Sequence, residues 1–283
     1  MATSSTAKPS QEVISSRDNR WLKRFRAALE SAPVKREDCV GLEGPRLVEE
    51  AFRSGLAIEA VLVSDDGERH LTRLKPWLTR EVRILRCSQR MFQGVASTDT
   101  PQGIAALAHM PEREFEELLG ARPLVLVLVG VQDPGNVGTL LRSAEAFGAT
   151  GAVTCRGTAH PLSPKALRAS AGSALRLPLL AAADDAKVLA RLRQAKLRIF
   201  AATIDGGESP GELDFSVPCA LLIGNESSGL PAEMARAADE RVRIALADGV
   251  ESLNAGVAGA VLLYEASRQR NARLRAGRPS ESP

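Results

Sequence analysis

The sequence has few residues of the kinds that hold metals or form disulfides. Four cysteines and three histidines are scattered through the 283 residues, and no two cysteines form a C-x-x-C pair. A disulfide scaffold and a structural zinc site are not expected, although distant residues can still meet in three dimensions, and no metal ligand is predicted. Free thiols suit a reducing compartment, so we expect the protein to act in the cytoplasm.

Long apolar runs are also missing. The longest, Leu124 to Val131, has the length of a strand, whereas a membrane-spanning helix needs about 20 apolar residues. The N-terminus is rich in Ser and Thr but has no apolar stretch, which excludes the pattern of a secretory signal. Neither a membrane partner nor secretion is predicted.

Positive charge is in small excess but is unevenly distributed. The formal net charge of +3 is too small to indicate a nucleic-acid partner by itself. One short stretch, which also holds Trp21 and Phe25, is strongly basic; its cations are Arg17, Arg20, Lys23, Arg24 and Arg26. A solvated amphipathic helix explains such a stretch. The alternative is a surface that contacts phosphates and offers an aromatic ring for base stacking.

The first 110 residues alternate between helical and strand patterns, which predicts a small α/β domain. Residues 1–16 are predicted to be a disordered lead-in, and the domain then spans 17–110. Helices are expected at about 18–31, 45–55, 69–78 and 89–95, and strands at 58–64, 82–85 and 104–107. Residues 111–121 follow as a charged linker that is predicted to be helical.

A second α/β pattern occupies residues 122–271. It begins with the run Leu124 to Val129, which is typical of a strand buried on both faces of a parallel sheet. Further strands are expected at 151–154, 198–203, 220–223 and 241–246. Helices are expected after the turn at 133–136, at 165–172, at 184–195 and from 254 to about 271. The basic tail, 272–283, is predicted to be disordered.

Three loops rich in Gly and small polar residues follow strands of this second domain, at 130–138, 222–230 and 249–256. Ligands of open α/β sheets bind at the carboxyl ends of strands, so these loops are candidates for a site. The first resembles a phosphate-binding turn, yet it contains neither G-x-G-x-x-G nor G-x-x-x-x-G-K-[ST]. Each loop alone is explained by turn formation or helix capping. A Rossmann-type nucleotide enzyme that uses the first loop is a further alternative.

The three loops together, in this order, resemble the motifs of the SpoU/TrmH family of SPOUT methyltransferases. The matching segments are NVGTLLR at 136–142, IGNE at 223–226 with Gly229 and Leu230, and ESLN at 251–254 with LLYE at 262–265. Leu42 to Ala51 resembles part of the substrate-binding domain that precedes many members, a ribosomal-protein-like RNA-binding fold. The chain departs from the family at Ala245, where Pro is usual, and at Ala255, where a bulkier residue is usual.

The resemblance implies an enzyme that transfers a methyl group from S-adenosylmethionine to a ribose 2′-hydroxyl of RNA. A separate substrate-binding domain favours ribosomal RNA; transfer RNA remains an alternative, as does a non-catalytic RNA-binding or assembly factor with a methyltransferase-like fold. The catalytic domain is expected to contain a parallel sheet and a deep trefoil knot, and to form a homodimer through the knotted region.

The resemblance also assigns residues. Catalytic roles fall to Asn136, Arg142, Glu226, Ser252 and Asn254. Ser252 and Asn254 would orient the ribose, Asn136 would order its loop, and Glu226 would hold loop backbone. Cofactor contacts are expected from Thr203, Gly224, Ile244 and Leu253. RNA contacts are expected from Arg17, Arg20, Lys23, Arg24 and Arg46.

Overall fold

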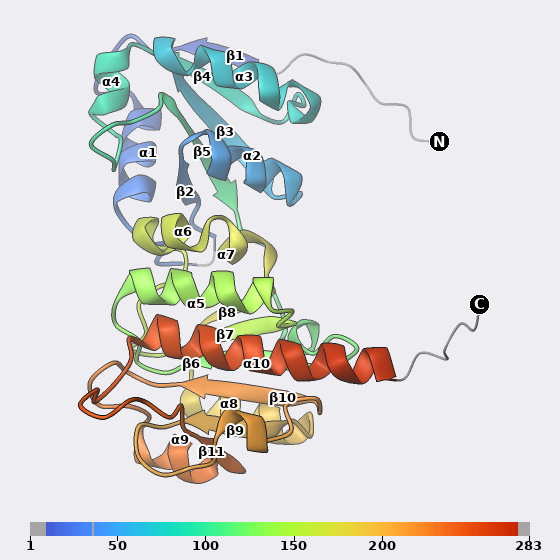
Figure 1. The fold of residues 1–283 in the computed structure, drawn as a ribbon. Helices are drawn as coiled ribbons and strands as arrows, with labels where there is room; N and C mark the ends of the chain where they lie inside the picture. Colours follow the sequence, from blue (N-terminus) through green and yellow to red (C-terminus); the bar gives the residue numbers. More distant parts are fainter. Residues whose placement is uncertain (1–9, 36, 277–283) are drawn as a thin grey trace, which may run out of the picture. The chain divides into compact units, whose positions relative to one another are not determined.

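The computed structural model describes residues 10–35 and 37–276, and the chain divides into two compact units (Figure 1). The first unit comprises Met1–Glu112 with Leu162–Arg168, and the second comprises Arg113–Pro161 with Ala169–Pro283. The short segment Leu162–Arg168 thus groups with the first unit, although the sequence places it inside the second α/β pattern. Among the described residues, none of the helices is apolar over a length that would cross a bilayer.

The first unit is built on a mixed five-stranded sheet with the order β1-β4-β3-β5-β2. Strands β1, β4 and β3 pair in parallel, and β5 runs antiparallel to both β3 and β2. The strands are β1 (Ser10–Val13), β2 (Val40–Glu43), β3 (Ala57–Ser64), β4 (Arg83–Cys87) and β5 (Ile104–His109). The helices are α1 (Arg20–Glu30), α2 (Pro45–Arg53), α3 (Glu68–Leu74) and α4 (Gln89–Gln93), with 3₁₀ turns η1 (Asp65–Gly67) and η2 (Lys75–Trp77).

Helix α1 covers one face of this sheet. Asn19 caps it by accepting a hydrogen bond from the Trp21 amide at 2.8 Å, and Trp21 and Phe25 are 4% and 0% exposed within the apolar core. The suggestion that one of these rings is free for base stacking is therefore wrong, because the apolar stripe of the helix faces the sheet. A Cβ at Gly41 would lie 2.4 Å from the Ala28 carbonyl oxygen, so α1 packs directly on the backbone of β2.

Two strands of the first unit were not predicted. Strand β1 forms within the lead-in that was expected to be disordered, and it pairs with β4 as an edge strand whose four residues are all exposed. The remainder of that lead-in up to residue 9 lies outside the described residues. Strand β2 has only four residues and contains Gly41. Strand β1 has no alternating apolar pattern, which is the signal that predicts a half-buried strand, and in β2 only Val40 and Leu42 supply it.

The second unit contains a six-stranded sheet in which every pair is parallel, as predicted, with the order β11-β9-β10-β6-β7-β8. The strands are β6 (Leu124–Leu128), β7 (Gly151–Cys155), β8 (Leu179–Ala183), β9 (Arg198–Ala202), β10 (Cys219–Ile223) and β11 (Glu240–Val242). The helices are α5 (Pro134–Ala146), α7 (Ser173–Arg176), α8 (Asp185–Gln194), α9 (Ala232–Ala237) and α10 (Ala255–Ala276), with 3₁₀ turns η3 (Phe115–Leu118) and η4 (Pro210–Glu212). Helix α6 (Pro164–Ser170) begins in the segment Leu162–Arg168 that groups with the first unit.

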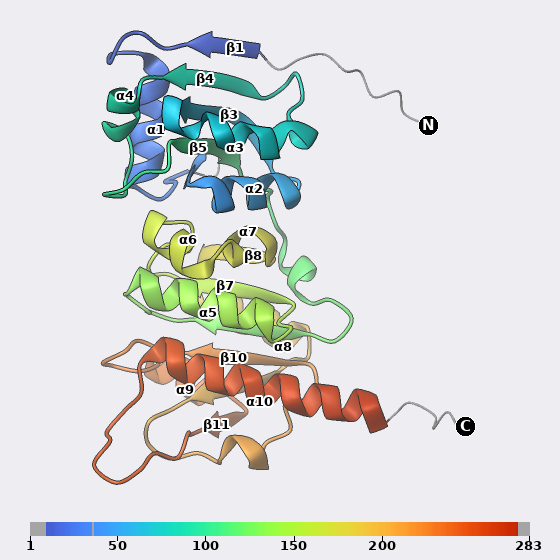
Figure 2. The ribbon, with the colours of Figure 1, turned by 45° about the horizontal axis from the view of Figure 1, so that its top comes forward.

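Helices cover both faces of the parallel sheet, which is why β6 and β10 are buried along their whole length. Val125 and Val127 point to the side of α8 and α9, where they join the core around Leu192. On the opposite face, α5 and α10 lie side by side (Figures 1 and 2). A Cβ at Gly259 of α10 would lie 2.1 Å from the side chain of Leu140 of α5, so a larger residue here would force that side chain to shift.

The second unit also differs from the prediction at several elements. The charged linker forms only the 3₁₀ turn η3 rather than a helix. Strand β11 ends at Val242, so Ile244 and Ala245 lie in the loop that follows and not in the strand. Strand β8 and helices α7 and α9 were not predicted; β8 consists of two leucines and three alanines and is only half-buried. The last helix continues through Ala276 into the predicted disordered tail, the rest of which lies outside the described residues.

Candidate active site

Three side chains from the three predicted loops form one hydrogen-bonded chain at the carboxyl end of the parallel sheet. The Asn254 side chain donates from Nδ2 to Oδ1 of Asn136, at 2.9 Å. Asn136 in turn donates from Nδ2 to Oε1 of Glu226, also at 2.9 Å. Asn136, at the centre, is 8% exposed. The structure thus brings together residues that are 90 and 118 positions apart in the sequence.

Glu226 also fastens the loop that follows β6. Its carboxylate accepts hydrogen bonds from the backbone amides of Gln132 at 3.2 Å and Asp133 at 3.5 Å. Burial is the largest single influence on this carboxyl and raises its pKa. The hydrogen bonds from Asn136 and from the backbone amides outweigh burial together and lower the pKa of Glu226 below its ordinary value. Glu226 is therefore an anion that holds loop backbone, the role that the resemblance implies.

Asn225, which sequence reasoning did not single out, fixes the loop after β10. Its Nδ2 donates to the Gly130 carbonyl at 2.8 Å, and its Oδ1 accepts from the amides of Ser227 and Ser228 at 2.9 Å. The preceding Gly224 leaves no space for a side chain, because a Cβ there would lie 2.4 Å from the Gly229 carbonyl carbon. The sequence did offer a signal for this role of Asn225. Asparagine side chains often accept hydrogen bonds from the backbone amides two or three residues later, and so stabilise turns.

A cavity of about 390 Å³ opens beside this hydrogen-bonded chain, a size within the range of small-molecule sites. All four predicted cofactor residues line it, namely Thr203, Gly224, Ile244 and Leu253. Glu226 and Ser252 line it as well, together with apolar groups that include Ile204 and Leu246. Leu253 is 37% exposed, so its side chain is available to a ligand.

The catalytic candidates do not all lie in one place. Ser252 is exposed at the cavity, whereas Arg142 is an exposed residue of α5 that is not among the cavity-lining residues. Within the described part of the chain, Arg142 has no hydrogen-bond or ion-pair partner, so its guanidinium is available to an external anion. The two positions at which the sequence departs from the family differ in their surroundings. Ala255 is buried and lines the cavity, whereas Ala245 is exposed and lies between two residues that line it.

The predicted RNA-contacting residues of the first unit are exposed, but they are not equivalent. Arg24 pairs with both carboxylate oxygens of Glu59, at 2.5 and 2.7 Å. Its guanidinium and that of Arg20 also lie over the Trp21 ring, 4.8 and 5.6 Å from the centroid. Lys23 lies 3.9 Å from Asp18. The remaining two candidates, Arg17 and Arg46, are exposed and have no such partner among the described residues.

Comparison with known proteins agrees with this geometry. Residues 123–264 match the model of the SpoU rRNA Methylase family, and residues 34–106 match an MRM3-like substrate binding domain. The chain belongs to the SpoU rRNA methylase family. The first match contains all five catalytic candidates, and membership removes the Rossmann-type alternative. The second match begins after α1, so the basic helix lies outside both matched regions.

Individual SpoU relatives extend over most of the chain. The 23S rRNA (guanosine(2553)-2′-O)-methyltransferase RlmP of Bacillus subtilis (strain 168) is 35% identical over 223 residues, which are 79% of this chain and 86% of that protein. A solved RNA 2′-O ribose methyltransferase is 34% identical with a TM-score of 0.75, covering 92% of this chain and 100% of its own. An AdoMet-bound rRNA methyltransferase from Sinorhizobium meliloti is 27% identical with a TM-score of 0.78. The match covers 91% of this chain and 98% of that protein.

Proposed function

We propose that the chain transfers a methyl group from S-adenosylmethionine to a ribose 2′-hydroxyl of ribosomal RNA. The observation that carries the proposal is the chain of hydrogen bonds Asn254–Asn136–Glu226 at the edge of a cavity of about 390 Å³ in a SpoU family member. The names of the B. subtilis and S. meliloti relatives support both the rRNA substrate and the cofactor.

The cavity suits S-adenosylmethionine in size and chemistry. Its apolar residues Ile244, Leu246 and Leu253 offer a surface for the adenine ring. The carboxylates of Glu226 and Glu251 lie at the same cavity and favour a ligand with a positive charge, such as a sulfonium. When bound, S-adenosylmethionine supplies an electrophilic methyl group, so the protein has to orient the ribose and make its oxygen more nucleophilic.

Arg142 and Ser252 are the groups that would act on the RNA. A guanidinium stays protonated at ordinary pH, so Arg142 acts as a cation and not as a base. It would fix an RNA phosphate next to the target ribose and stabilise the developing alkoxide, which leaves that phosphate to accept the 2′-proton. Ser252, exposed at the cavity, would orient the ribose by a hydrogen bond. Asn254 is committed to Asn136 and to the Val257 amide, so it positions the site.

Methylation assays test the substrate directly. The purified protein should transfer methyl groups from S-adenosylmethionine to ribosomal RNA, and mass spectrometry of the digested RNA should find a 2′-O-methylated nucleoside. Transfer RNA at the same concentration serves as the competing substrate, and methylation of transfer RNA alone would replace rRNA in the proposal. Absence of methylation with both RNAs, despite cofactor binding, would favour a non-catalytic assembly factor. The cytoplasm is the proposed location, where the four free cysteines remain reduced.

In the first unit, the basic residues at and just before helix α1, together with Arg46, would bind the RNA. Arg17, Arg20 and Arg46 are exposed and able to contact phosphates. Replacing Arg17 and Arg20 by Gln should weaken RNA binding and reduce the slope of log affinity against log salt by about two, one for each phosphate that is no longer neutralised. Replacing Arg236 and Arg243 of the second unit by Gln is the matched control. Equal losses in both pairs would indicate nonspecific attraction and contradict the assignment.

A homodimer through the second unit is also proposed. Three apolar side chains, Val257, Val261 and Tyr264, are 49%, 41% and 56% exposed. Their spacing of four and three residues places them on one face of α10, as expected for a helix that packs against a partner. Light scattering should give twice the mass of the chain, and Val261→Glu should shift the protein to monomers. A monomeric wild-type protein at micromolar concentration would contradict the proposal.

The deep trefoil knot belongs to the same proposal. Strand β11 lies at the edge of the sheet, beyond β9 and β10, whereas α10 packs beside α5 near the centre. Residues 243–254 therefore cross back over the carboxyl ends of β9 and β10, where they line the same cavity as the loop after β10. Mechanical unfolding from both termini tests the knot, because a knotted chain reaches a shorter final length than an unknotted chain of the same number of residues.

A further inference from the structure

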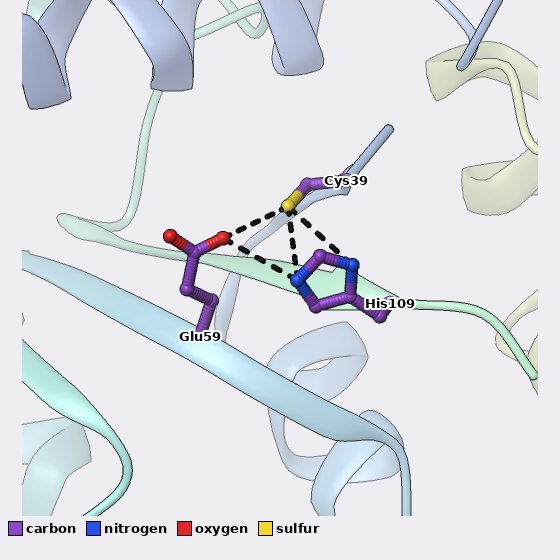
Figure 3. Close-up of side chains that lie close together, drawn as sticks. All are labelled: Cys39, Glu59 and His109. Atoms are coloured by element: carbon purple, nitrogen blue, oxygen red, sulfur yellow. Dashed lines mark hydrogen bonds and ion pairs between the residues drawn. The ribbon is translucent and has the colours of Figure 1, made fainter. Parts of the chain in front are cut away.

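Three potential metal ligands converge in the first unit, far from the methyl-transfer residues in sequence (Figure 3). The Cys39 Sγ lies 3.1 Å from Glu59 Oε2 and 3.5 Å from His109 Nε2. The His109 Nε2 lies 3.4 Å from the same Glu59 oxygen. One sulfur, one nitrogen and one oxygen atom thus form a nearly equilateral triangle, although no pattern in the sequence predicts a metal site.

The sheet brings these residues together through strand pairing and one irregularity. Val40 of β2 pairs with Ala108 of β5, so the residues that come next, Cys39 and His109, are neighbours. On the other side of β5, the register with β3 shifts between Ile58 and Ala60, which leaves Glu59 without a partner residue. Such a bulge redirects a side chain, and bulges are frequent at functional sites. Here the bulge directs Glu59 toward the other two residues.

The triangle has the dimensions of one face of a tetrahedral zinc site. Zinc bonds of about 2.3 Å to sulfur and about 2.0–2.2 Å to nitrogen and oxygen, at tetrahedral angles, separate the ligand atoms by about 3.3–3.6 Å. The observed separations are 3.1, 3.4 and 3.5 Å. The shortest joins sulfur and oxygen, where the Cys39 thiol now donates a hydrogen bond to Glu59. The three ligand atoms could therefore reach a metal with little movement.

We propose that Cys39, Glu59 and His109 bind one divalent ion of the zinc class. Thiolate, imidazole and carboxylate are together the ligand set that zinc prefers, and Cys39 would release its proton on binding. Arg24 would support the site through its hydrogen bond to Glu59 Oε1, whereas its contacts with Glu59 Oε2 at 2.7 Å and with Cys39 Sγ at 3.6 Å would have to give way to the ion. Cys39 lines a cavity of about 290 Å³ and His109 is exposed, so the cluster is accessible from solvent.

Such an ion would tie the ends of β2, β3 and β5 together, and its binding would be independent of methyl transfer. The test uses the full chain without an affinity tag, reduced and freed of metal by a chelator. Titration with Zn²⁺ against a chromophoric competitor should show one tight equivalent. Cobalt in place of zinc should give the intense visible bands of tetrahedral Co²⁺ and a near-ultraviolet thiolate charge-transfer band.

Two variants decide whether these residues are the ligands. Cys39→Ser and His109→Ala should each weaken Zn²⁺ binding at least about tenfold, and Cys39→Ser should remove the charge-transfer band. His70→Ala, which changes a histidine outside the cluster, should leave both signals unchanged. Circular dichroism confirms folding, and Zn²⁺ should raise the melting temperature of the wild type but not of His109→Ala. Absence of binding, or binding that both ligand variants retain, would overturn the proposal while leaving methyl transfer untouched.

Discussion

The side chain of Asn254 donates a hydrogen bond to that of Asn136 at 2.9 Å, across 118 residues of sequence. Asn254 uses its other side-chain atom to accept from the Val257 amide at the start of α10. The amide group therefore joins the beginning of α10 to the beginning of α5, and through Asn136 to Glu226. Because Glu226 and the start of α10 line the cavity, the Asn254–Asn136 pair supports two parts of its wall.

Replacing Asn254 should disturb the site more than the fold. Asn254→Ala removes a helix cap and leaves Asn136, which is buried, with an unsatisfied oxygen, so we expect a loss of about 1–2 kcal/mol in the free energy of unfolding. Methyl transfer should fall by at least about tenfold, since Glu226 loses its ordered partner. Urea denaturation and initial rates measure the two effects. Asn271→Ala, in the same helix, is the control and should change neither.

Leu253 should govern cofactor affinity. Calorimetric titration of the wild type with S-adenosylmethionine and S-adenosylhomocysteine should give micromolar dissociation constants, within the usual range for such a pocket. Leu253→Glu places a charge in the apolar part of the cavity and should weaken binding by about 100-fold or more. Leu274→Glu changes a leucine of α10 that is 53% exposed and should have no effect. Equal affinity of the two variants would contradict this position for the cofactor.

Arg142 should matter for turnover and not for cofactor binding. Lysine preserves the charge but loses the planar, bidentate geometry that suits a phosphate, so Arg142→Lys should lower kcat by about 10- to 100-fold. Affinity for S-adenosylmethionine should remain within about twofold of the wild type, because Arg142 does not line the cavity. Arg236→Lys, an exposed arginine of α9, is the control. Parallel losses of kcat and cofactor affinity would exclude the proposed role.

Gly259 should be required for the packing of α5 against α10. Gly259→Val adds a branched side chain where even a Cβ would lie 2.1 Å from Leu140, so we expect a loss of about 1–3 kcal/mol in the free energy of unfolding. Gly211→Val is the matched control, because no atom lies within 4 Å of its Cβ position. A stability equal to that of the control would mean that Leu140 moves aside without cost.

The sequence predicts which loops meet at the candidate site better than it predicts the other parts of the fold, for a physical reason. Asn136, Glu226 and Asn254 belong to short loops that follow strongly apolar strands, and the carboxyl ends of parallel strands meet at one edge. Loop motifs and strand signals therefore agree on the same location. Arg142 lies within helix α5 and not in a loop after a strand, so this rule does not predict its position. The direction of its side chain depends on the rotation of α5 about its own axis and on the neighbouring elements.

The parts that were not predicted lack a local signal. Strands β1 and β8 are edge strands without a buried alternating pattern, so pairing partners and not composition determine them. The cluster of Cys39, Glu59 and His109 depends on the registers of three strands and on a one-residue bulge in β3. A register is a long-range property, and a shift by one residue would turn the side chains to the other face. The burial of Trp21 likewise depends on the sheet beneath α1.

Acid should weaken the first unit through Glu59. The hydrogen bonds from Arg24 are the largest influence on this carboxyl, and they lower its pKa from 4.5 to about 2. A carboxylate with a lowered pKa stabilises the folded state above its unfolded pKa, and this contribution is lost as the pH falls through the folded value. The contribution of Glu59 should thus be complete above about pH 5 and disappear between about 4.5 and 2. Both side chains are partly exposed to solvent, which limits the effect to about 1 kcal/mol.

Glu59→Gln isolates this contribution, because glutamine keeps the size of the side chain but does not titrate. Urea denaturation at intervals from pH 7 to pH 2.5, in the presence of a chelator, should show the variant less stable than the wild type at neutral pH. The difference should shrink below pH 4.5, because Glu59 of the unfolded wild type becomes protonated there while the folded carboxylate stays charged down to about pH 2. A difference that stays constant down to pH 2.5 would mean that the Arg24–Glu59 pair does not hold the carboxylate in its charged form. The stability lost in the variant would then not come from the charge of the Glu59 carboxylate.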